Sequence, residues 1–109
     1  MERYIQVTTT TERREDAERI AQTLLERRLA ACAQISGPIS SSYRWRDGIE
    51  SASEWLCAIK TRDALYAQVE AAIVALHPYE TPEIVAVALA AGSAPYLTWI
   101  EESTTPARG

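Results

Sequence analysis

A chain of 109 residues is long enough for one folded domain, and its 47% hydrophobic and 24% charged residues are typical of a globular protein rather than a disordered or membrane-spanning one. The net charge of −4, with basic residues scattered along the sequence, argues against binding to a nucleic-acid backbone. We therefore expect a single domain over residues 1–103, a flexible tail over residues 104–109, and no nucleic-acid partner.

No apolar segment has the length that a signal peptide or a transmembrane helix requires. This predicts a cytoplasmic protein without a membrane partner. Its two cysteines, Cys32 and Cys57, lie in segments that resemble buried strands. We expect both to be reduced thiols in the core.

The first segment, residues 4–9, alternates between two sets of side chains with a period of two, which predicts a strand. Residues 12–29 then carry apolar side chains at helical spacing, with acidic residues at the start, where they favour the helix dipole. A long strand follows from residue 31 to residue 45, with a bend or bulge at Gly37-Pro38. Asp47-Gly48 predicts a hairpin turn in which both residues have positive φ, and the next strand spans residues 54–61.

The second half repeats the alternation of helix and strand. Residues 62–76 carry an apolar helical stripe that ends before Pro78, and residues 83–89 form an apolar strand. Ser93 is suited to cap a last helix that extends to about residue 102. The order β-α-β-β-α-β predicts a ferredoxin-like α+β sandwich with an extra C-terminal helix.

Two strands are apolar on both sides, whereas the outer face of such a sandwich is normally polar. The strand at residues 54–61 has Trp55, Cys57 and Ile59 on one face and Leu56 and Ala58 on the other, and residues 84–89 are apolar throughout. The two helices cover only one face. We therefore expect other copies of this chain to cover the second face.

The segment His77-Pro78-Tyr79-Glu80-Thr81-Pro82 concentrates the chain's only histidine, a phenol and a carboxylate in a stiff loop. Imidazole and carboxylate are ligands of zinc and copper, and copper(I) prefers a thiolate such as Cys32. We therefore propose His77, Cys32 and Glu80 as metal ligands, in a weak site completed by water or a second subunit. A proline-rich connection with no ligand is an alternative interpretation.

Lys60 and Tyr79 are further candidates for a cleft that binds a small anion or a partner, although Lys60 is also suited to a solvated strand end. Glycine-framed serine, Walker and Rossmann motifs are absent from the sequence. We predict that the protein is not an enzyme, and the sequence indicates no resident cofactor.

Several segments together closely resemble the CutA divalent-cation tolerance family, above all Ala30-Ala31-Cys32 and His77-Pro78-Tyr79-Glu80-Thr81-Pro82-Glu83. The resemblance implies a trimer similar in architecture to the PII signalling proteins, tolerance to divalent cations, and copper binding. The family's metal positions match Cys32 and His77. Some relatives have a cysteine and a second histidine where this chain has Thr8 and Leu76, so two ligands are missing here.

Three functions follow from this sequence. The first is a trimeric protein that binds or responds to divalent metal ions such as copper. The second is a PII-like sensor or scaffold that binds a small ligand or a partner protein between subunits without metal. In the third, Trp45, Trp55, Tyr79 and Trp99 serve only to pack a very stable trimer.

Overall fold

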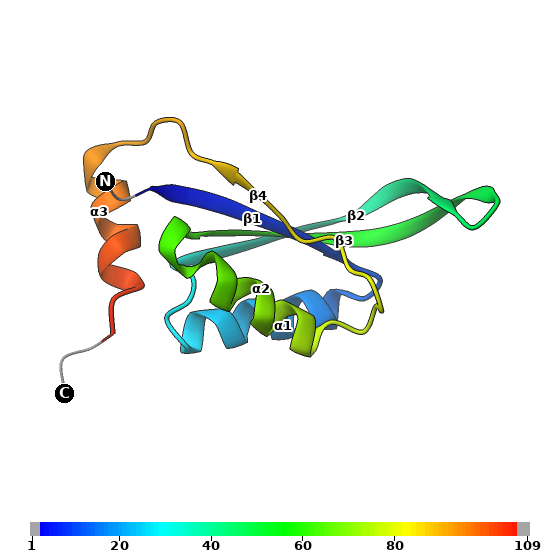
Figure 1. Ribbon diagram of the computed structural model, residues 1–109, viewed down its shortest axis with the longest axis horizontal. Helices are drawn as coiled ribbons and strands as arrows, with labels where there is room; N and C mark the ends of the chain where they lie inside the picture. The colour runs from blue at the N-terminus through cyan, green and yellow to red at the C-terminus, as the bar shows by residue number, and fades with distance from the viewer. Residues whose placement is uncertain (1–2, 107–109) are drawn as a thin grey trace.

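The computed structural model describes residues 3–106, in which a four-stranded sheet carries two helices on one face and a third helix at one end (Figure 1). This confirms the predicted ferredoxin-like α+β fold with an extra C-terminal helix. The elements in chain order are β1 (Tyr4–Thr11), α1 (Arg14–Glu26), β2 (Cys32–Trp45), β3 (Gly48–Arg62), the short 3-10 helix η1 (Asp63–Leu65), α2 (Tyr66–Leu76), β4 (Val85–Ala88) and α3 (Ala94–Ser103).

The sheet is antiparallel and has the strand order β2-β3-β1-β4. Val7 in β1 lies between Ile59 of β3 and Ala86 of β4, which sets the register of the three strands. Because side chains alternate between the two sides of a strand, this register places one set of apolar side chains on the helix-covered face.

The core lies between this face and the helices α1 and α2, which pack side by side below the sheet in Figure 1. The predicted stripe of α1 is confirmed, since Ile20 and Leu24 are fully buried. The helix is shorter than the predicted 12–29. After Glu26 the chain turns through Arg28, whose φ of 56° is outside the helical region, and Leu29 then enters the core from the connection.

The hairpin formed by β2 and β3 extends well beyond the other strands, as Figure 1 shows on the right. β1 ends at Thr11, opposite Trp55, so residues 39–54 form a two-stranded ribbon that pairs with no third strand of residues 3–106. The predicted irregularity at Gly37-Pro38 is confirmed as a shift in register between Ser36 and Ile39.

The hairpin turn lies one residue earlier in the chain than predicted. The turn residues are Arg46 and Asp47, while Gly48 already pairs with Trp45 as the first residue of β3. Arg46 takes the positive φ, 56°, and Gly48 does not. Pairing along the ladder determines the turn here, and it overrides the local preference of Asp-Gly.

The second sheet face is open and partly apolar, as the strand pattern predicts. Val85 and Val87 on β4 are 52% and 57% exposed, and Leu56 and Ala58 on β3 are half-buried on the same face. β4 is shorter than the predicted 83–89 but keeps its apolar character.

The two cysteines lie on opposite faces. Cys57 is fully buried in the core as predicted, but Cys32 is half-buried on the open face, so its predicted place in the core is wrong. Cys32 pairs with Lys60 and Cys57 with Ile35, and the odd difference between positions 57 and 60 puts the two thiols on different sides. Both cysteines are free.

The last helix begins at the predicted cap, where Ser93 Oγ accepts a hydrogen bond from the Tyr96 backbone N–H. Its end is firmly attached. Thr104, expected at the start of the flexible tail, is 2% exposed, and its Oγ1 accepts a 2.8 Å hydrogen bond from Arg62 Nε. Residues 107–109 of the expected tail lie outside the described residues. None of the helices within residues 3–106 combines the length and apolar character needed to cross a bilayer.

Candidate functional site

The loop that follows α2 is attached to the sheet through its histidine. His77 is the C-cap of α2 and is 8% exposed. Its Nε2 lies 2.8 Å from the Thr10 carbonyl oxygen, and its Nδ1 accepts a 3.1 Å hydrogen bond from the Tyr79 backbone N–H. A carbonyl can only accept, so Nε2 carries the proton and the imidazole is the neutral Nε2–H tautomer. Both ring nitrogens are therefore occupied.

Tyr79 connects this loop to β3. Its ring lies 4.7 Å from the His77 ring between centroids, and its hydroxyl donates a 2.7 Å hydrogen bond to Glu54 Oε2. Burial, followed by this hydrogen bond to a carboxylate, raises the pKa of Tyr79 well above its ordinary value. Tyr79 is thus a hydrogen-bond donor throughout the physiological pH range.

Glu54 is the main residue at this site that the sequence analysis missed. It is 8% exposed at the base of the hairpin, although glutamate is rarely buried without a partner. A charged residue directly beside the apolar run 55–59 was the available signal. Its partner, Tyr79, lies 25 residues away, so only the folded chain brings the two together.

Cys32 and Lys60 form a second group, near the other end of β1. The two residues are opposite each other on β2 and β3, and Lys60 Nζ donates a 2.8 Å hydrogen bond to Gln34 Oε1. Burial and then the nearby Cys32 thiol raise the pKa of Tyr96 on α3. A half-buried thiol, an amine and a phenol thus share this part of the open face.

The two groups do not meet within one chain. Lys60 pairs with Gln6, whereas His77 contacts Thr10, four residues or about 13 Å further along β1 at roughly 3.3 Å per residue. Glu80 is exposed on the loop. Within the part of the chain that the structure describes, no three His, Cys, Asp or Glu side chains lie close enough to hold a metal ion. The predicted ligands therefore do not form a site in a single chain.

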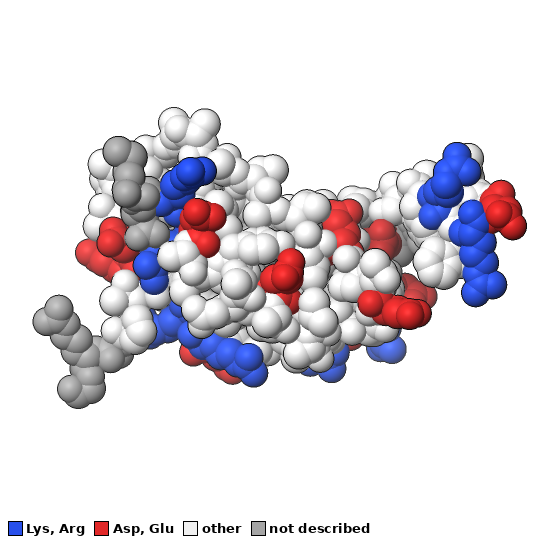
Figure 2. Space-filling view, in the orientation of Figure 1, with Lys and Arg blue, Asp and Glu red and all other residues white. Residues whose placement is uncertain are grey.

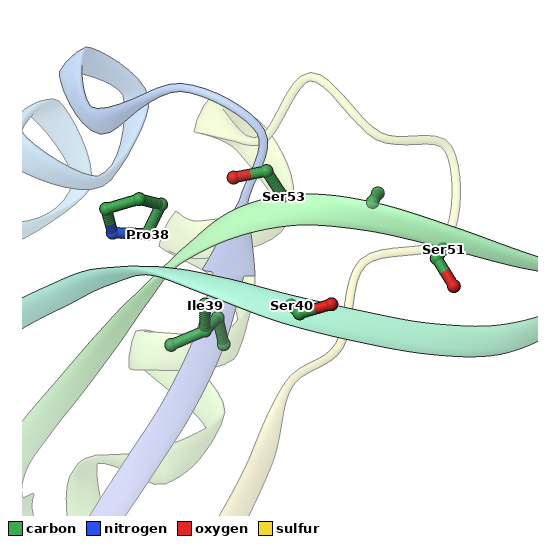
Figure 3. A pocket seen from close by; sticks show the side chains of 6 residues that line it. Pro38, Ile39, Ser40, Ser51 and Ser53 are labelled. Carbon is green, nitrogen blue, oxygen red and sulfur yellow. The ribbon is translucent and has the colours of Figure 1, made fainter.

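A shallow groove of about 390 Å³ lies along the hairpin ribbon (Figure 3). It contains hydroxyl groups and apolar surface but no acid, base or thiol, and no predicted site residue contributes to it. Its lining residues are Pro38, Ile39, Ser40, Ser51, Ala52 and Ser53.

Comparison with known proteins identifies close relatives. The family model described as "CutA1 divalent ion tolerance protein" matches residues 5–103. The divalent-cation tolerance protein CutA of Thermus thermophilus is 39% identical over 104 residues, which are 95% of this chain and 99% of that protein.

Solved structures agree with these matches. The crystal structure of the divalent ion tolerance protein CutA1 from Ehrlichia chaffeensis superposes with a TM-score of 0.92 at 35% identity, over 97% of this chain and 99% of that one. The structure of the periplasmic divalent cation tolerance protein CutA from Archaeoglobus fulgidus has a TM-score of 0.89 at 40% identity, over 96% of this chain and 100% of that one.

Proposed function

The chain belongs to the CutA1 divalent ion tolerance family, and from that premise we propose that it acts as a homotrimer that binds or responds to divalent metal ions such as copper. The tolerance function is that of the family. The trimer, the metal ligands, the absence of catalysis and the cellular location are our proposals, and each has its own support.

The open sheet face supports assembly, and it is the observation on which the proposal mainly rests. Val85 and Val87 expose more than half of their surface on this face. In the described part of the chain, the ribbon at residues 39–54 has strand partners only within itself, and an isolated two-stranded hairpin is marginally stable in water. Copies of the same chain cover both features at once. The number three comes from the resemblance to CutA.

Metal binding then takes place between subunits. Cys32 has a partly exposed thiol, which copper(I) prefers as a ligand, and Glu80 has a free carboxylate on the surface. His77 would have to release the Tyr79 N–H or the Thr10 carbonyl before one of its nitrogens reached a metal. Because Cys32 and His77 of one chain lie far apart, a site that uses both takes them from different copies.

We propose that the protein does not catalyse a reaction. Its single histidine donates through Nε2 and accepts through Nδ1, so no nitrogen is left to act as a general base. The buried Cys57 thiol has a pKa raised to about 11 by burial, which disfavours a nucleophilic thiolate.

We also propose a cytoplasmic location, as the sequence analysis predicts. Cell fractionation with detection of the tagged full-length protein tests this. Recovery in a periplasmic or organelle fraction would contradict it.

The central experiment is a titration of copper(I), copper(II) and zinc into wild type, Cys32→Ser, His77→Ala and Cys57→Ala, with bound metal measured after gel filtration. Loss of Cys32 is expected to weaken copper(I) binding about tenfold or more, since thiolates dominate that affinity. Loss of the core thiol Cys57 is the matched control and leaves binding unchanged. Equal metal content in all four proteins would show that Cys32 and His77 are not metal ligands. Sedimentation velocity on the same samples tests whether the protein is a trimer.

A further inference from the structure

Among residues 3–106, no cationic side chain forms an ion pair with Glu54. Glu54 is 8% exposed as a residue, and within residues 3–106 the one hydrogen bond to its carboxylate comes from Tyr79. The ion pairs within residues 3–106 join Arg13 to Glu15, Arg14 to Glu18 and Arg19 to Asp16, so none includes Glu54. Taking a carboxylate out of water without a counter-charge costs several kcal/mol, so buried carboxylates are normally paired.

The surroundings add negative charge. The pairing of Thr11 with Trp55 places Glu12 next to Glu54 at the end of β1, and Glu12 also raises the pKa of Tyr79. The second oxygen of Glu54, Oε1, accepts no hydrogen bond within the described residues. Among residues 3–106, the side-chain oxygen that is both fully buried and without a hydrogen-bond partner is Thr9 Oγ1, and Oε1 of Glu54 is not in that class. Oε1 is therefore not fully enclosed by its own chain.

A guanidinium group fits this position better than a metal ion. A metal needs three or more ligands close together, and the described residues contain no such group. One arginine, in contrast, satisfies a carboxylate oxygen by itself with a charge-assisted hydrogen bond.

The hairpin tip offers such a group. Figure 2 shows basic side chains in blue, next to acidic ones in red, at the free end of the hairpin, away from the body of the molecule. The basic residues of this segment are Arg44 and Arg46. Arg46 lies over the ring of Trp45 at 5.9 Å, whereas Arg44 makes no ion pair within residues 3–106. Arg44 pairs with Ile49, which is five residues or about 16 Å along β3 from Glu54, too far for contact in the same chain.

The tip also carries apolar surface that favours docking. Tyr43, Trp45 and Ile49 are 41%, 51% and 73% exposed. Aromatic residues and arginine are the types enriched at interfaces between proteins. The tip and the base of the hairpin are different surfaces of one chain, so pairing them is a head-to-tail contact that can close into a ring.

We infer that, in the homo-oligomer proposed above, Arg44 at the hairpin tip of one copy donates a hydrogen bond to Glu54 Oε1 at the hairpin base of the next copy. Each buried carboxylate then has one donor from its own chain, Tyr79, and one from its neighbour. The site is incomplete in a single chain.

The test measures subunit dissociation by sedimentation and by fluorescence on dilution for wild type, Arg44→Ala, Glu54→Gln and the double variant. Each single change is expected to raise the dissociation constant about tenfold or more. The double variant is expected to raise it no further than the more damaging single variant does. Arg44 is on the exposed tip, so its loss leaves the subunit fold intact. Arg46→Ala removes the same charge from the same tip and is expected to change dissociation less than threefold, about the scatter of an exposed charge.

Additive effects in the double variant, or a larger effect of Arg46→Ala than of Arg44→Ala, would overturn the inference. So would a Glu54→Gln protein that loses bound copper or zinc while its dissociation is unchanged, which would make Glu54 a metal ligand. A wild type that sediments as a monomer at every concentration would remove the proposed assembly itself. If the protein is a stable oligomer that none of these variants weakens, the contact between Arg44 and Glu54 is wrong but the proposed assembly stands.

Discussion

The hydroxyl of Tyr79 donates a 2.7 Å hydrogen bond to Oε2 of Glu54, which joins the loop after α2 to the base of the β2-β3 hairpin. On the same loop, His77 bonds the end of β1 through the Thr10 carbonyl oxygen. The loop is thus attached to two neighbouring strands, and its polar side chains are part of the fold before they are part of any binding site.

Replacing Tyr79 with phenylalanine is expected to destabilise the protein by about 2 kcal/mol, because the carboxylate of Glu54 loses the hydrogen bond that its own chain donates. Urea unfolding measures this. Tyr66→Phe is the matched control: it removes a 3.0 Å hydrogen bond to Glu70 that lies at the surface and is expected to cost less than about 0.5 kcal/mol. Equal losses in the two variants would show that the burial of Glu54 does not matter.

Replacing His77 with alanine leaves the Thr10 carbonyl and the Tyr79 N–H without their partner in a buried place. We expect a loss of about 2–3 kcal/mol in thermal or urea unfolding. Glutamine can still donate toward Thr10, and asparagine can still accept from Tyr79. Each should therefore cost less than alanine. If all three variants are as stable as wild type, the two hydrogen bonds do not contribute to the fold.

Replacing Gly37 with alanine is expected to destabilise the bulge by about 1–3 kcal/mol. Its φ of 153° is rare for residues with a Cβ, and the added atom would lie 2.9 Å from a ring carbon of Trp55. Gly48→Ala is the control, since a Cβ there meets nothing within 4 Å. Differential scanning calorimetry compares the two, and equal midpoints would contradict the expectation.

The alkaline stability of the protein is expected to depend on Cys57. Burial raises the pKa of this thiol from 9.0 to about 11 in the folded state. A group whose pKa is raised by folding holds its proton more tightly in the folded chain, so its contribution is complete below pH 9 and is lost as the pH rises toward 11. The loss is about 2–3 kcal/mol. Urea unfolding between about pH 8 and about pH 11 measures the slope.

Cys57→Ala is less stable at neutral pH because of the cavity it leaves, but its stability is expected to fall less steeply with pH. The same slope in Cys57→Ala and wild type would refute the assignment.

Shortening the chain tests how far the folded unit extends. A protein that ends at Pro106, the last residue that the structure describes, is the reference. One that ends at Ser103 loses the bonds that Arg62 donates to Thr104 Oγ1 and to the Thr104 carbonyl, and should be about 1–3 kcal/mol less stable. Equal thermal midpoints would mean that the ordered domain ends at residue 103.

Local patterns in the sequence predict much of the architecture. The apolar stripe that includes Ile20 and Leu24 predicts α1 because helical periodicity repeats every 3.6 residues, and α1 buries both side chains. Ser93 predicts the start of α3 because its hydroxyl bonds a free N–H of the first turn. Such signals depend on neighbours within a few positions.

The errors come from relationships between distant positions. Asp47-Gly48 is a good turn by itself, but ladder pairing places the turn at Arg46 and Asp47. The local sequence around Cys32 predicts a core residue, but its pairing with Lys60 places it on the open face. The burial of Glu54 depends on Tyr79, which lies 25 residues away in the sequence and contacts it only in the folded chain.

The sequence by itself determined the order of elements, the family and the two-sided apolar strands, because periodicity and motif spacing are properties of neighbouring residues. Only the tertiary structure decided that both nitrogens of His77 are occupied, that Cys32 lies apart from it, and that Glu54 is buried beside Tyr79. Burial and hydrogen bonding depend on which distant segments meet, and strand register sets this once the whole sheet has formed.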